Sequence, residues 1–165
     1  MRKLRLTAIG VCLIGLSTVC QAANYCAWIN EATVSGLLGG EAVGVVTEAP
    51  AGQPAACAFI QQGERGKRSL RVTVEIARDA HARLGAIAPA CGTDAVPMRA
   101  IGNEALICTA DEHKNQMGER VVGRVRDQVF TITIGTTLKN DPILTRDELK
   151  SRIYTAAEQV SGNLF

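Results

Sequence analysis

The sequence has 165 residues, with 18 Lys and Arg against 16 Asp and Glu and a formal charge of +2. Three of the cations and none of the acids lie in residues 1–22, so the rest of the chain carries a charge of −1. A near-neutral chain gives no electrostatic basis for nucleic-acid binding, and this length is typical of one domain.

The first 22 residues have the pattern of a secretory signal peptide. Three cations precede an uncharged apolar run over residues 6–20, and the small residues Cys20 and Ala22 suit a signal peptidase. The run is about 15 residues long, shorter than the roughly 20 that span a bilayer. We therefore predict cleavage after Ala22, or alternatively after Ala23. An uncleaved anchor is the other alternative. The expected product is a single periplasmic or secreted α+β domain over residues 23–165, without a stable membrane span.

Four cysteines remain after this segment, namely Cys26, Cys57, Cys91 and Cys108. An even number in an exported protein indicates two disulfides, for which three pairings exist. We favour Cys26–Cys57 and Cys91–Cys108, which join neighbours in the sequence. Free, buried thiols are the alternative.

A short helix is the first expected element of the domain. Asn30 can cap it, and Ile29 and Val34 fit a hydrophobic staple around that cap. The glycines at 39–40 are expected to end the helix, because glycine adopts the left-handed conformation without a steric penalty.

The middle of the chain is predicted to hold one hairpin and a weak helix. Residues 42–54 read as a loop because Pro50, Gly52 and Pro54 break any regular element. A first strand begins at Cys57, and a second is predicted over residues 70–76, where apolar and polar residues alternate. The polar turn 62–68 joins them, and residues 78–88 form a weak helical stretch.

Two further segments and a final helix complete the prediction. Residues 105–108 read as a strand, and residues 119–135 as the clearest hairpin. Thr145 and Glu148 form a capping box for the last helix, which Gly162 is expected to end. Together the segments predict an antiparallel sheet of about five strands covered by N- and C-terminal helices and stapled by disulfides.

One segment offers groups that could bind a metal or catalyse a reaction. Cys108, Asp111, Glu112 and His113 lie within six residues. However, a structural zinc site needs four ligands, His81 is the only other histidine, and a disulfide-bonded Cys108 supplies no thiolate. We therefore predict neither an enzyme nor a bound metal or cofactor. A metal-binding or hydrolytic protein that uses this segment is the alternative.

Two features are candidates for contact with a partner. Arg65, Lys67 and Arg68 belong to a basic turn, and with Arg71 they form a basic cluster that either is simply solvated or touches an acidic partner or anionic envelope component. Trp28 either packs against a Cys26–Cys57 bridge or stays exposed as a binding anchor.

Several short motifs resemble a family of small exported bacterial domains of unknown function, many of which are actinobacterial lipoproteins. They are Cys26 before a helix that ends "LLGG", then "ACAF", "IGNEALI", the "VVGRVRDQVFTITI" hairpin and the last helix, which together cover most of residues 23–165. The resemblance implies a helix-covered antiparallel sheet and a helix-to-strand disulfide, and it implies no catalytic residues. The chain differs from the family in its second cysteine pair and in lacking a lipidation motif.

The function predicted from these features is that of an exported, non-enzymatic domain that binds a protein partner or a cell-envelope component. An inhibitor or immunity-type protein is a further alternative.

Overall fold

A computed structural model describes residues 25–47, 53–110 and 116–165 of the chain. The predicted signal peptide and the three polar residues of the candidate metal segment, Asp111, Glu112 and His113, lie outside the described residues. Within the described part, no helix has both the length and the apolar composition needed to cross a membrane.

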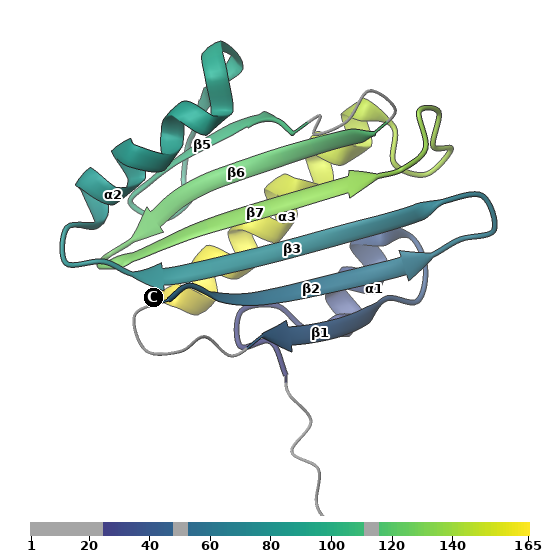
Figure 1. Ribbon diagram of the computed structural model, residues 1–165, viewed down its shortest axis with the longest axis horizontal. Helices are drawn as coiled ribbons and strands as arrows, with labels where there is room; N and C mark the ends of the chain where they lie inside the picture. Colours follow the sequence, from purple (N-terminus) through teal and green to yellow (C-terminus); the bar gives the residue numbers. More distant parts are fainter. Residues whose placement is uncertain (1–24, 48–52, 111–115) are drawn as a thin grey trace, which may run out of the picture.

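The chain forms an antiparallel sheet whose strand order is β1-β2-β3-β7-β6-β5-β4 (Figure 1). Each strand pairs only with antiparallel neighbours. The fold is therefore α+β with an antiparallel sheet, as predicted, but the sheet has seven strands and not about five. The strands are β1 (Val43–Thr47), β2 (Ala55–Gln62), β3 (Lys67–Ile76), β4 (Val96–Met98), β5 (Glu104–Thr109), β6 (Met117–Val125) and β7 (Gln128–Thr136).

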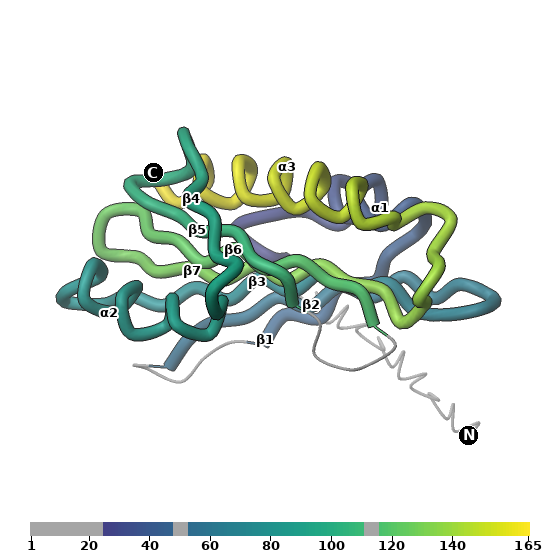
Figure 2. The backbone as a smooth tube through the Cα atoms, turned by 90° about the horizontal axis from the view of Figure 1, so that it is seen from above, coloured from purple at the N-terminus to yellow at the C-terminus, as the bar shows by residue number. Residues whose placement is uncertain are grey.

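Helices lie on both faces of the sheet. Figure 2 shows α1 (Glu31–Leu38) and α3 (Arg146–Leu164) together on one face, which confirms the expected cover by the terminal helices. On the opposite face lies α2 (Ala80–Ile87), and the 3₁₀ helix η1 (Ala88–Asp94) continues from it. Because α2 contacts β6 and β7, it covers only one end of that second face.

The predicted helix caps are largely confirmed. The Asn30 side chain accepts a hydrogen bond from the Thr33 amide, and Gly39 ends α1 with a φ of 72°. Thr145 caps α3 by accepting from the Glu148 amide. The prediction that Gly162 ends α3 is wrong, since the helix continues to Leu164. Leu164 is buried in the core, so its packing stabilises the last turn despite the low helix propensity of glycine.

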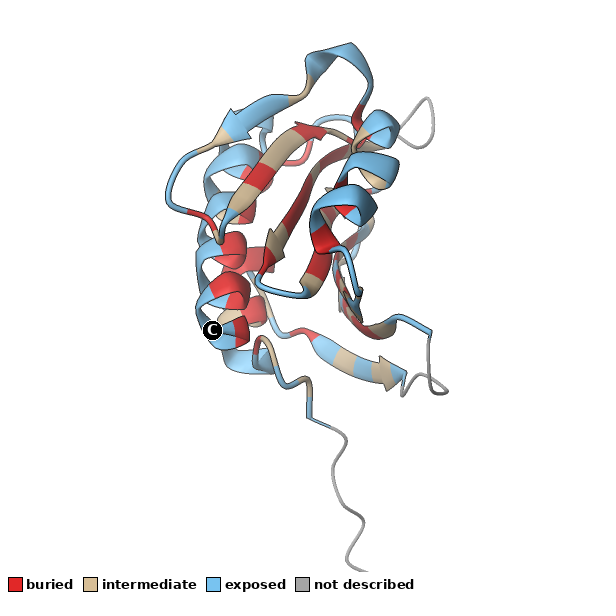
Figure 3. Cartoon of the chain, turned by 90° about the vertical axis from the view of Figure 1, so that its left-hand side faces the viewer, coloured by how far each residue is buried: buried red, intermediate tan, exposed pale blue. Residues whose placement is uncertain are grey.

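The main core lies between the sheet and the α1–α3 layer. Alternate residues of the central strands point into it, with Leu70 and Val72 of β3 beside Ile132 and Ile134 of β7. Figure 3 shows buried residues along the strands and in the helices that pack against them. A second, smaller cluster, around Leu84 of α2, fills the space on the opposite face.

Two strands were absent from the sequence prediction. Residues 43–47 were expected to be a loop, yet they form β1, which pairs with β2 along the sheet edge. Residues 96–98, which none of the expected elements covers, form β4. Both are edge strands, and their structure depends on pairing with a distant segment more than on a local pattern of hydrophobicity.

Both predicted disulfides form. Cys26 is bonded to Cys57 across 31 residues of sequence, and Cys91 is bonded to Cys108 across 17. The first joins the segment before α1 to the core face of β2, and the second holds η1 against β5 on the opposite face. Two disulfides are compatible with an oxidising compartment.

Candidate functional site

The segment that suggested a metal or catalytic site does not supply a thiolate. Cys108 lies in β5 and is bonded to Cys91, and its residue is 3% exposed. Its sulfur is therefore neither a nucleophile nor a metal ligand in this state. Among the described residues, no three His, Cys, Asp or Glu side chains gather closely enough to hold a metal ion.

The three cations of the predicted basic turn have different environments. Arg65 and Lys67 are exposed, whereas Arg68 is buried on the core face of β3. Arg68 donates two hydrogen bonds to the Asp141 carboxylate, from Nε at 2.7 Å and from Nη2 at 2.9 Å. The expectation that Arg68 touches a partner is thus corrected: the side chain belongs to the fold, because Asp141 requires its charge there.

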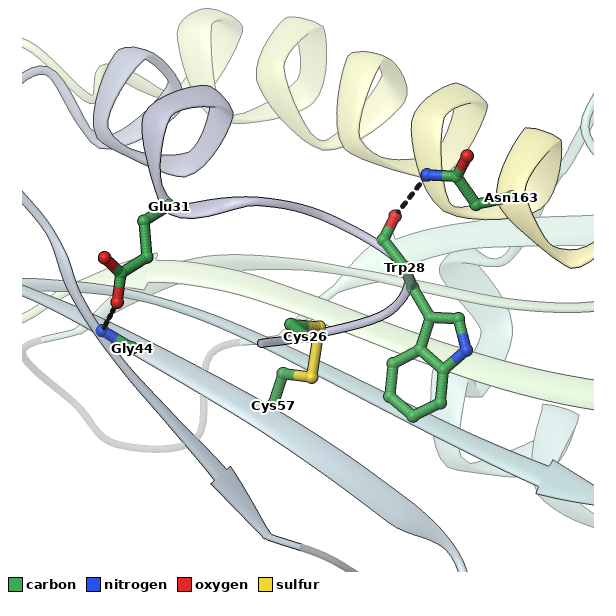
Figure 4. Close-up of a disulfide and its surroundings, with 6 residues drawn as sticks. All are labelled: Cys26, Trp28, Glu31, Gly44, Cys57 and Asn163. Carbon is green, nitrogen blue, oxygen red and sulfur yellow. Dashed lines mark hydrogen bonds between the residues drawn. A yellow bond between two sulfur atoms is a disulfide. The ribbon is translucent and has the colours of Figure 1, made fainter. Parts of the chain in front are cut away.

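Trp28 belongs mainly to the packing of the fold. Its side chain is half-buried against the main core, and its carbonyl oxygen accepts a hydrogen bond from Asn163 of α3 at 2.8 Å. Figure 4 shows the indole pointing toward the sheet, on the side where the Cys26–Cys57 disulfide connects to β2. The environment corresponds to the packing alternative and not to a fully exposed anchor.

The structure reveals a surface that the sequence prediction missed, which we call the open face. It is the part of the sheet opposite α1 and α3 that α2 and η1 leave uncovered (Figure 2). The open face consists of Val43, Val45, Ala58, Ile60, Ser69, Arg71, Thr73, Arg120, Thr131 and Thr133.

Two arginines of the open face lie in one row across three strands. Arg71 of β3 is opposite Thr133 of β7, and Thr133 is opposite Arg120 of β6. Residues directly opposite each other point to the same side of a sheet, and neighbouring strands are about 4.8 Å apart. The two guanidinium groups therefore rise from backbones about 10 Å apart, with a threonine hydroxyl between them.

A groove borders this row on the side of α2 and η1. Its volume is about 360 Å³. The strands form its floor with Thr73, Thr131 and Thr133, and Ile87 and Ala90 belong to its wall. Since η1 is tied to β5 by the Cys91–Cys108 disulfide, the wall of the groove is covalently fixed to the sheet.

Neighbouring acids do not neutralise Arg71. Glu75 of the same strand forms an ion pair with Arg83 of α2, and this pair raises the pKa of Arg83. Glu104 of β5 is held by hydrogen bonds from His81 and Arg124, which lower the pKa of its carboxyl. No carboxylate among the described residues pairs with Arg71.

An apolar strip continues the open face toward the sheet edge. Val43 and Val45 of β1 are 66% and 61% exposed, and Ile60 of β2 is 41% exposed. The register places Val43 opposite Ile60, and Val45 in line with Arg71 through the intervening Ala58. The surface thus offers a cation, hydroxyl donors and an apolar strip side by side.

Compared with protein-family models, curated proteins and solved structures, the chain matches none of them. The resemblance to small exported bacterial domains therefore stays a prediction from its motifs.

Proposed function

We propose that this protein is an exported, non-enzymatic binding domain that holds an acidic segment of a protein partner on its open face. The observation that carries the proposal is the exposed Arg71 of β3, which lies opposite Thr133 of β7 beside the groove. Guanidinium groups bind carboxylates through paired, charge-assisted hydrogen bonds, and a threonine hydroxyl adds a further donor.

The shape of the surface favours a protein segment over a flat bilayer. The wall made by α2 and η1 stands above the strands and borders the groove beside the arginine row. A membrane surface would meet this wall before it reached Arg71, whereas an acidic loop or strand can lie along the floor. The exposed valines of β1 supply apolar contact next to the charges, as the centres of protein interfaces do.

A charge-reversal pair tests the proposal. The probe is a fluorescent synthetic peptide of alternating Glu and Val, and the measurement is its affinity by fluorescence anisotropy at low and at physiological salt. We expect Arg71→Glu to weaken binding by at least about tenfold, which corresponds to about 1.4 kcal/mol. Arg99→Glu is the matched control, because Arg99 is exposed on the α3 side, where its carbonyl oxygen accepts a hydrogen bond from Tyr154.

Specific outcomes would contradict the proposal. Equal weakening by both substitutions would show non-specific attraction to the whole chain, and an unchanged affinity for Arg71→Glu would show that the open face is not the site. Vesicles that contain phosphatidylglycerol serve as the second probe. Their binding, with no binding of the peptide, would favour an envelope lipid and refute the protein partner.

A further inference from the structure

The outer edge of β1 forms a second candidate site, distinct from the open face. β1 pairs with β2 on one side only, so the groups on its other side point away from the sheet. The Gly44 amide is one of these groups, and it donates to the Glu31 carboxylate at 2.9 Å (Figure 4). Because outward groups alternate along a strand, the Val46 amide points the same way.

The two edges of the sheet differ in how open they are to pairing. At the far edge, β4 has three residues, and Pro97 in its centre lacks an amide donor. β1 has five residues without proline or charge, and its Val43 and Val45 side chains are exposed. Among the described residues, no turn or loop carbonyl oxygen accepts a hydrogen bond from the Val46 amide. β1 is therefore the edge suited to receive another strand.

A pocket lies beside this edge. It has a volume of about 500 Å³ and lies between the segment before α1 and the strands β1 and β2. Ile29 and Phe59 supply apolar lining, Tyr25 and Val46 flank it, and the Glu31 carboxylate is at its border. A Cβ atom on Gly44 would lie 2.7 Å from the Phe59 ring and 2.9 Å from the Glu31 carboxylate, so glycine keeps the three groups in close contact.

The Glu31 carboxylate takes the place that a backbone carbonyl oxygen of an added strand would have beside Gly44. This carboxylate accepts from an outward strand amide, as the backbone of an added strand would. Glu31 is exposed, and among the described residues no cation forms an ion pair with it. An added strand would release the carboxylate from Gly44 and leave a negative charge at the border of the apolar pocket. A Lys or Arg of the added strand would complement that charge.

We propose that β1 and its pocket bind an extended peptide segment of a partner protein, which adds to the sheet as an eighth strand. Main-chain hydrogen bonds to Gly44 and Val46 hold the peptide. An apolar side chain enters the pocket, and a Lys or Arg two positions away, on the same side of the peptide, pairs with Glu31. The ligand proposed for β1 is basic and apolar, whereas the ligand proposed for the open face is acidic. Experiments with the two kinds of peptide therefore test the two proposals independently.

The test uses the predicted exported domain, residues 23–165, with both disulfides intact. The probe is the acetylated and amidated peptide Thr-Lys-Thr-Leu-Thr, titrated into isotope-labelled protein and followed by the amide signals in nuclear magnetic resonance spectra. We expect the Gly44 and Val46 amides to shift and to become protected from hydrogen exchange. Glu31→Gln should weaken binding by about tenfold, since it removes the ion pair with lysine.

Two further variants make the result specific. Val46→Pro removes the outward amide, which proline tolerates at a sheet edge, and should abolish peptide binding while the other amide signals stay in place. Glu41→Gln is the control, because this exposed acid is near the edge in sequence and does not line the pocket. Its affinity should match that of the unmodified protein.

Three results would overturn the proposal. One is the absence of shifts at Gly44 and Val46 at millimolar peptide. Another is full peptide binding by Val46→Pro. The third is a concentration-dependent shift of the β1 amides without peptide, which would show that a second copy of the chain occupies the edge.

Discussion

Arg68 of β3 and Asp141, which precedes α3, form a buried ion pair between positions 73 residues apart in the sequence. Arg68 also donates to the carbonyl oxygen of Leu38, at the end of α1. Asp141 accepts from the Thr136 hydroxyl and from the amides of Ile143 and Leu144. The pair therefore joins both helices of one layer to the sheet beneath them.

Breaking this pair from one side should be strongly destabilising. Arg68→Met leaves the Asp141 carboxylate buried without a counter-charge, and we expect the free energy of unfolding to fall by about 3–5 kcal/mol. Lys67→Met is the control, because Lys67 is next to Arg68 in the sequence but its own side chain is exposed. This substitution should change stability by less than about 0.5 kcal/mol. Urea unfolding measures both, and equal effects would contradict the structural role of the pair.

The same pair should make stability depend on acid pH. Burial alone would raise the pKa of Asp141, but the hydrogen bonds from Arg68 and its other donors outweigh burial and hold the pKa well below its usual range. The unfolded carboxyl has a pKa of about 3.9, so its stabilisation is complete above about pH 5 and is lost as the pH falls below about 4.

The substitution Asp141→Asn isolates this contribution. The difference in unfolding free energy between the unmodified protein and Asp141→Asn should be constant near neutrality and should shrink in acid. A difference that stays constant down to about pH 3 would mean that the Asp141 pKa is not depressed.

Two glycines with different surroundings should respond oppositely to alanine. A Cβ atom on Gly123 of β6 would lie 2.6 Å from the Phe130 ring and 2.9 Å from Ala105, so Gly123→Ala should cost about 1–3 kcal/mol. At Gly162 in α3 nothing lies within 4 Å, and Gly162→Ala should stabilise the protein by about 0.5–1 kcal/mol. Thermal unfolding distinguishes the two, and a loss of stability at Gly162 would argue that α3 ends before it.

Each disulfide should contribute measurably to stability. Replacing both Cys26 and Cys57 by serine should lower the unfolding free energy by about 2–5 kcal/mol, because the unfolded chain gains freedom. The pair Cys91 and Cys108 closes a shorter loop, of 17 against 31 residues, and should cost slightly less. An unchanged melting temperature for either double variant, or free thiols in the purified protein by mass spectrometry, would contradict that bridge.

The elements that the sequence predicted correctly have strong local signals. The Asn30 cap and Gly39 mark both ends of α1, and the alternation over residues 70–76 and 119–135 marks three central strands. In each case the residues that define the element are close in sequence, so the pattern alone was sufficient. The cysteine pairing also followed sequence order.

The open face could not be predicted, because it depends on register between distant strands. Arg71 and Arg120 become neighbours only when β7 pairs with both β3 and β6. Arg68 and Arg71 looked equivalent in the basic cluster, yet their positions on β3 differ by an odd number of residues and place them on opposite faces. The prediction placed Arg68 in the turn 62–68. Had β3 been known to start at Lys67, the alternation of the strand would have placed Arg68 on the core face and Arg71 on the open face.

The most direct test of the central claim is the location of the acidic peptide on the protein. The measurement is the set of amide signals that shift when the Glu–Val peptide is titrated into isotope-labelled protein with both disulfides intact. We predict shifts that cluster at Arg71, Thr133 and Arg120 and along the groove formed with α2, and that disappear in Arg71→Glu. Shifts confined to the α1–α3 side, or none at millimolar peptide, would contradict the proposal that the open face binds an acidic partner.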